Sequence, residues 1–94
     1  MEFEWDEPKH AKTLRDRGIG FDDGARIFAG PVLIWPVLIW EDARREYGGG
    51  RFRSVGETNG DILHVVFTWR GDAVRIISVR RANRRETEVW LRVK

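Results

Sequence analysis

The stretch RFRSVGETNGDILHVVFTWRGDAVRIISVRR, residues 51–81, decides the fold of this chain. It contains Asn59-Gly60, the dipeptide most typical of a two-residue β-hairpin turn. Gly71-Asp72 marks a second turn between two apolar runs. The residues between these turns are rich in valine, isoleucine and aromatic side chains, which favour extended structure. The sequence therefore predicts a three-stranded meander, with strands at 51–57, 62–70 and 73–81.

Side chains alternate between the two faces of a strand, so each predicted strand has two distinct sides. In the second strand, one face is expected to hold Leu63, Val65, Phe67 and Trp69. In the third strand, strict alternation puts Arg75 with Ile77, Val79 and Arg81, and Arg80 on the opposite face with Val74, Ile76 and Ser78. An arginine within an apolar strand is costly without a partner. Two explanations are open: a salt bridge to the acidic half of the chain, or a sheet face that binds phosphate.

Three further segments carry helix signals, at residues 7–17, 20–30 and 83–94. Asp6 is placed to cap the first of these helices, and Gly18 is a typical residue just beyond a helix end. Asn83 and Glu86 have the spacing of a reciprocal capping box at the start of the last helix. With a short strand at 2–5 and another within 31–40, the order of elements predicts an α+β fold. We expect a compact antiparallel sheet of about four to five strands, two N-terminal helices and one C-terminal helix, in a single domain over residues 1–94.

Charge is distributed unevenly along the 94 residues. Residues 1–50 contain seven Lys and Arg against ten Asp and Glu, whereas residues 51–94 contain ten against five. Six arginines fall within residues 70–85, where Asp72 is the one acid. Arginine suits sites that grip phosphate or carboxylate with a planar fork. A polyanionic partner and a solvated charged surface both fit this pattern.

Several classes of site are excluded or disfavoured. The chain has no cysteine, and its two histidines, His10 and His64, lack the spacing of a metal site, so neither a metal nor another cofactor is expected. The N-terminus lacks a secretory signal, and the apolar run at 29–40 contains two prolines and is too short to span a bilayer. We therefore expect a cytoplasmic protein. RNA can be cleaved without metal, because its own 2′-OH attacks the phosphate, and arginine suits stabilisation of the phosphorane. Glu86 or His64 could exchange the protons.

Four segments together resemble the BrnT toxin family, a group of RelE-like type II toxins. They are EFEWDEPK at 2–9, GIGFDDGARIF at 18–28, a GPVLIWED pattern around 30–42 that the chain interrupts with a repeat, and VVFTWRGDAVRIISVRRANRRE at 65–86. The resemblance implies a compact RelE-like ribonuclease that cleaves RNA, inhibits translation and is neutralised by a BrnA-type antitoxin. It also implies site residues at the family's recurrent charged positions. The catalytic candidates are Arg75, Arg80 and Glu86, and the candidates for binding RNA phosphate are Arg51, Arg70 and Arg85.

The chain departs from the family pattern at Thr13, Arg17, Gly49 and Trp90, where other side chains recur. A second reading therefore stays open, in which an Arg-rich module binds antitoxin and nucleic acid without cleaving. PVLIWPVLIW at 31–40 is a pentapeptide written twice, and we read it as a tandem duplication of one strand. One copy is expected in the sheet. The other would bulge at Pro36 or extend as an apolar arm that favours a homodimer.

Overall fold

The computed structural model describes residues 1–37 and 50–94. Within them the chain forms a five-stranded sheet with the strand order β1-β5-β4-β3-β2. Its elements in chain order are β1 (Glu2–Glu4), α1 (Glu7–Arg17), α2 (Phe21–Arg26), the short 3-10 helix η1 (Ile27–Ala29), β2 (Val32–Pro36), β3 (Phe52–Thr58), β4 (Asp61–Arg70), β5 (Ala73–Arg81) and α4 (Arg84–Val93). The predicted α+β class, the meander and the three helices are confirmed. The sheet is mixed, however, because β1 runs parallel to β5.

Local signals set the turns and helix ends where the sequence predicts them. Asn59 and Gly60 both have positive φ, at 51° and 83°, as the tight turn between β3 and β4 requires. Gly18 ends α1 in the left-handed conformation, and the Asp6 carboxylate accepts a hydrogen bond from the Lys9 backbone N–H at 3.0 Å. These ends hold α1 at its predicted length, although none of its residues is buried.

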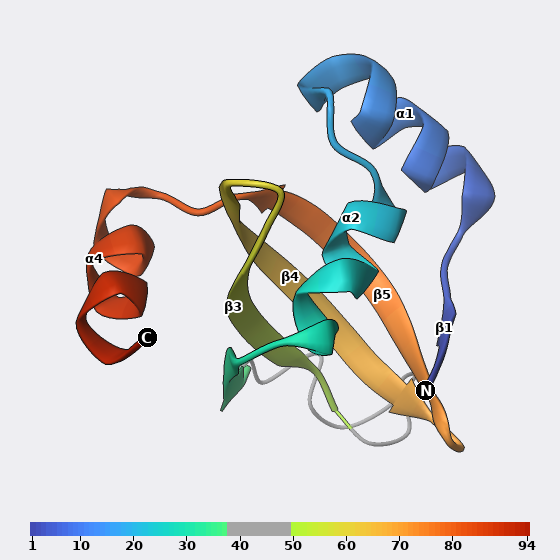
Figure 1. Ribbon diagram of the computed structural model, residues 1–94. Coiled ribbons are helices and arrows are strands. Elements are labelled where there is room, and N and C mark those ends of the chain that lie inside the picture. The colour runs from blue at the N-terminus through green and yellow to red at the C-terminus, as the bar shows by residue number, and fades with distance from the viewer. Residues whose placement is uncertain (38–49) are drawn as a thin grey trace.

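The core lies between α2, η1 and one face of the sheet. Figure 1 shows α2 lying across β4 and β5, with α4 on its own beside β3. The fully buried core residues include Phe21, Ile27, Leu63, Val65 and Phe67. Gly24 lets α2 approach the sheet closely, because a Cβ at this position would lie 2.7 Å from a methyl group of Val79.

Helix α4 packs on the other face of the sheet, which we call the α4 face. Trp90 is buried there, and its indole N–H donates a hydrogen bond to Glu57 of β3 at 3.1 Å. The N-terminus of α4 carries the predicted capping box, since Asn83 accepts from the Glu86 backbone N–H and Glu86 accepts from that of Asn83. Helix α4 thus lies against β3 on this face, and among the described residues β2 and β1 are the edge strands of the sheet.

The first copy of the repeat forms β2 and pairs with β3. Pro36 is the last residue of β2, and Val37 donates a backbone hydrogen bond to Arg51 at 2.9 Å. Pro36 lies at an edge strand's end, where its missing N–H costs no ladder bond. Residues 38–40 of the second copy lie outside the described residues, so the expected bulge or arm stays a prediction.

Candidate nucleic-acid interface

The α4 face is assembled from side chains of three neighbouring strands. In the sheet register His64 pairs with Arg80, Val66 with Ser78, and Thr68 with Arg75. These β4 residues alternate with the core residues and therefore point to the opposite face. On β3, alternation places Arg53 and Val55 on this same face, because Arg53 pairs with Val66 and Val55 with His64. Arg51 directly precedes β3, and continuing the alternation by one step puts it on this face as well.

A β-bulge in β5 brings Arg75 and Arg80 to the same face. Val66 pairs with Ser78, but the next residue, Phe67, pairs with Ile76, so Ile77 has no partner on β4. The extra residue reverses the alternation, since the side chains on either side of a bulge change phase. The core contains Val74, Ile76 and Val79 for this reason. The prediction that Arg75 and Arg80 lie on opposite faces is therefore wrong.

Arg80 and Glu86 form a bidentate pair that joins β5 to α4. The two terminal guanidinium nitrogens of Arg80, Nη1 and Nη2, donate to separate carboxylate oxygens of Glu86 at 2.9 Å. The Glu86 side chain is 9% exposed, and the Arg80 hydrogen bonds lower its pKa from 4.5 to about 2. Glu86 is therefore ionised at neutral pH, and its carboxylate is engaged both by Arg80 and by the cap of α4.

His64 lies beneath this pair. Its Nε2 is 3.8 Å from Glu86, and within the described residues neither ring nitrogen has a hydrogen-bond partner. Burial lowers the pKa of His64, and the positive charge of Arg80 lowers it further. The imidazole is therefore neutral at pH 7, and the side chain is almost inaccessible to solvent.

The other end of the α4 face holds Arg75 and Thr68, which pair in the sheet register. Arg75 and Arg51 both line a cavity of about 290 Å³ near the start of α1. Glu4 of β1 lies 3.5 Å from Arg75 and 3.4 Å from the exposed Arg70, so it links the two arginines. Within the described residues Glu4 is thus shared by two arginines, and the cavity is also lined by Asp6 and Lys9.

Arg85 stands apart from these residues on α4. It lines a cavity of about 280 Å³ between α4 and the edge of the sheet, together with Trp35, Arg53, Asn83, Glu86 and Val89. Sequence reasoning missed Trp35 and Arg53 as members of this site. The available signal was the alternation of Arg51 and Arg53, which puts both on one face of β3.

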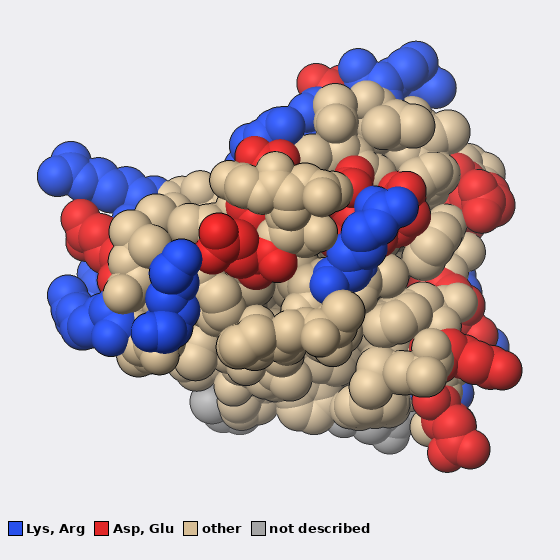
Figure 2. Space-filling view, viewed as in Figure 1, with Lys and Arg blue, Asp and Glu red and all other residues tan. Residues whose placement is uncertain are grey.

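The opposite face of the molecule differs from the α4 face in its distribution of charge. Figure 2 shows that, on the side covered by α2, most of the surface is uncharged and the cations gather mainly over α1 and α4. Acidic and basic residues lie close together there, as in the ion pairs of Arg26 with Asp22 and Asp23. The gathered arginines of the α4 face therefore make it the better candidate for a polyanion.

Most of the chain matches the model of one protein family. The model of a family described as "Ribonuclease toxin, BrnT, of type II toxin-antitoxin system" matches residues 5–86. The chain belongs to this family. No curated protein matches the chain. The family assignment confirms the predicted BrnT resemblance and makes the chain a member of a group of ribonuclease toxins that work with an antitoxin.

Two positions at which the chain departs from the BrnT pattern, Arg17 and Trp90, have clear structural roles. Arg17 donates a hydrogen bond to the backbone carbonyl of Val79 at 3.0 Å, and so helps to tie α1 to β5. Thr13 lines a small cavity beside it. Trp90 anchors α4, as described above. The fourth of these positions, Gly49, lies outside the described residues.

In residues 1–37 and 50–94, no group of three or more His, Cys, Asp or Glu is placed to hold a metal ion. None of the helices in this part of the chain is both long and apolar enough to cross a membrane.

Proposed function

We propose that this chain is an endoribonuclease toxin that cleaves RNA on the α4 face without a metal ion. The observation that carries this proposal is the bulge at Ile77, which gathers Arg75 and Arg80 on the face that also holds Arg51. These three arginines form a cationic surface that can bind consecutive phosphates.

In the proposed reaction the 2′-oxygen of the RNA attacks the adjacent phosphorus. The bond from phosphorus to the 5′-oxygen breaks, and the product carries a cyclic phosphate. The proton of the 2′-OH leaves as the new bond forms, and the 5′-oxygen gains a proton as it departs. Negative charge develops on the phosphoryl oxygens in the transition state, and Arg75 and Arg80 are assigned to stabilise it. Arg51, Arg70 and Arg85 are assigned to the flanking phosphates.

Glu86 is assigned a positioning role in this scheme. Its low pKa makes it a weak proton acceptor, and both oxygens already accept hydrogen bonds from Arg80. It instead fixes the Arg80 guanidinium in one orientation. Proton exchange would then fall to His64, which requires α4 to move, or to solvent.

The same pair supports a second candidate function. Because the negative charge of Glu86 offsets the positive charge of Arg80, Arg80 would stabilise a phosphorane less strongly. A non-cleaving module that binds antitoxin and nucleic acid is therefore the alternative. Under either function the proposed partner is a BrnA-type antitoxin. For the ribonuclease, the proposed consequence is inhibition of translation in the cytoplasm.

One experiment separates the two functions. The chain is expressed to test for growth arrest, and the purified protein is incubated with RNA in excess EDTA. A ribonuclease cleaves RNA, and Arg75→Ala reduces cleavage by about one to two decades, since a charge-assisted contact contributes roughly 1.5–3 kcal/mol. Arg15→Ala, which removes an exposed charge from α1, serves as the matched control. Intact RNA with retained antitoxin binding would establish the non-cleaving module instead.

A further inference from the structure

The cavity between α4 and the edge of the sheet, lined by Trp35, Arg53 and Arg85, has the properties of a separate anion site. We call it the Trp35 cavity. Its volume is about 280 Å³. Trp35 pairs with Arg53 in the sheet register, and the Arg53 guanidinium lies 4.9 Å from the centroid of the indole ring. This cation–π contact holds the guanidinium in place before any ligand arrives.

The charges of the Trp35 cavity are unbalanced. Within the described part of the chain, neither Arg53 nor Arg85 has an ion-pair partner. The one acid in the lining is Glu86, whose charge is already matched by Arg80. Asn83 is occupied as well, because its side chain accepts from the Glu86 backbone N–H at 2.8 Å. Two cations are therefore left to face the cavity.

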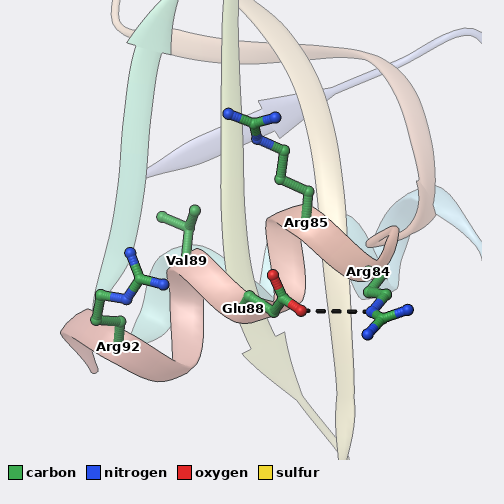
Figure 3. A pocket seen from close by; sticks show the side chains of 5 residues that line it. All are labelled: Arg84, Arg85, Glu88, Val89 and Arg92. Carbon is green, nitrogen blue, oxygen red and sulfur yellow. Dashed lines mark hydrogen bonds and ion pairs between the residues drawn. The ribbon is translucent and has the colours of Figure 1, made fainter.

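The direction of Arg85 supports this assignment. Figure 3 shows that Arg84 and Arg85 leave α4 in different directions, with Arg84 joined to Glu88 on its own side. The Arg84 side chain is 92% exposed and lies 3.4 Å from Glu88. Arg85 lines the Trp35 cavity and Arg84 does not. Arg85 therefore borders two hollows, the Trp35 cavity and the pocket that it shares with Arg84, Glu88 and Arg92.

We propose that the Trp35 cavity binds a nucleotide of single-stranded RNA next to the cleaved bond, with its phosphate between Arg53 and Arg85. This inference rests on the proposed ribonuclease function. Arg53 lies opposite Val66, and Val66 lies opposite Ser78. The cavity therefore borders the same face of the sheet as Arg75 and Arg80, with β4 between Arg53 and the strand that carries them. A strand with repeated phosphates can occupy both places at once, whereas an isolated anion would use only one.

The test uses a single-stranded RNA oligonucleotide with 2′-O-methyl groups, which cannot be cleaved because the attacking oxygen is blocked. Its Kd for the full chain is measured by fluorescence anisotropy over a range of salt concentrations. Arg53→Ala and Arg85→Ala should each weaken binding about tenfold or more, as expected for a charge-assisted phosphate contact. Each should also lower the slope of log K against log salt by about 0.7, the contribution of one phosphate contact in a single strand. Arg84→Ala is the control, and its Kd should stay within about twofold of wild type because its charge is paired and exposed.

Two results would overturn the proposal. In the first, both variants keep the affinity and the salt slope of Arg84→Ala. In the second, they keep RNA affinity but lose antitoxin binding, which would make the cavity a protein interface. Should Arg53→Ala fail to fold by circular dichroism, Arg85→Ala decides alone, since Arg85 is an exposed residue of α4.

Failure of the ribonuclease function would be seen separately. Wild-type protein is incubated with the unmodified oligonucleotide in parallel. A protein that binds the 2′-O-methyl strand through Arg53 and Arg85 yet leaves the unmodified strand intact would retain the subsite and refute the cleavage activity.

Discussion

Replacing Glu86 by glutamine tests how the α4 face is held together. The substitution keeps the size of the side chain but removes its negative charge. The carboxylate of Glu86 accepts hydrogen bonds from the two terminal guanidinium nitrogens of Arg80 at 2.9 Å. The amide oxygen can still accept from the Asn83 backbone N–H, so the cap of α4 is partly retained. The variant therefore isolates the ion pair between α4 and β5.

The expected magnitude follows from the pKa of Glu86. A pKa lowered from 4.5 to about 2 corresponds to at most ~3–4 kcal/mol of stability. Because Arg80 is 35% exposed, solvent screening reduces this figure to about 1–2 kcal/mol. For a domain of this length we expect Glu86→Gln to lower Tm by roughly 4–16 °C at neutral pH.

The pH dependence has a definite sign. The folded-state pKa of Glu86 is depressed, so its contribution is fully present above about pH 4.5 and is lost as pH falls toward 2. The difference in unfolding free energy between wild type and Glu86→Gln should therefore shrink over this window. Urea titrations at pH 7, 5, 4 and 3 measure it.

Glu88→Gln is the matched control on the same helix. Glu88 is 56% exposed and lies 3.4 Å from Arg84, so its removal should cost less than about 0.5 kcal/mol. Equal effects of the two variants, or a Glu86→Gln effect that stays constant from pH 7 to pH 3, would refute a stabilising role for the buried pair.

Three further predictions concern packing, the repeat and metal dependence. Gly24→Ala should destabilise the chain, because the added Cβ would lie 2.7 Å from a methyl group of Val79, and such overpacking costs about 1–3 kcal/mol. This cost outweighs a helix-propensity gain of about 1 kcal/mol. Gly30→Ala, whose Cβ would meet nothing within 4 Å, should be near neutral in the same urea titration. Deletion of residues 31–35 should leave a folded monomer, because residues 36–40 repeat the deleted sequence. An unfolded product in circular dichroism would show that both copies are structural. Light scattering before and after the deletion tests whether the repeat forms a homodimer. RNA cleavage should be unchanged by EDTA, since the assigned chemistry uses arginines and the RNA's own 2′-OH; restoration of a lost activity by added Mg²⁺ would contradict it.

Turns and caps could be predicted from sequence because their causes are local. A positive φ at Gly18 and Gly60 depends on the absence of a Cβ at those residues alone. The capping box of α4 depends on two side chains three residues apart, Asn83 and Glu86, and both hydrogen bonds are present. These signals determine where the elements begin and end, and from them follow the number and order of the helices and most of the strands.

The pairing of distant segments could not be predicted in the same way. Whether β1 joins the sheet parallel or antiparallel depends on how the chain returns after α1 and α2, and no residue of β1 encodes that choice. The contact of Arg53 with Trp35 likewise depends on which strand lies beside β3. Such features are properties of the assembled sheet, and so the Trp35 cavity could not be recognised from either residue alone.

The bulge at Ile77 had a sequence signal. The core residues Val74, Ile76 and Val79 are spaced by two and then by three, and an odd step in the apolar pattern of a strand indicates an extra residue. Without that residue Arg75 and Arg80 would take opposite faces, and one of them would enter the core with no room for a guanidinium. With it, both arginines leave the core, and the same face receives Glu86 from α4. The bulge at Ile77, which keeps an arginine out of the core, therefore also brings Arg75 and Arg80 together in the proposed RNA site.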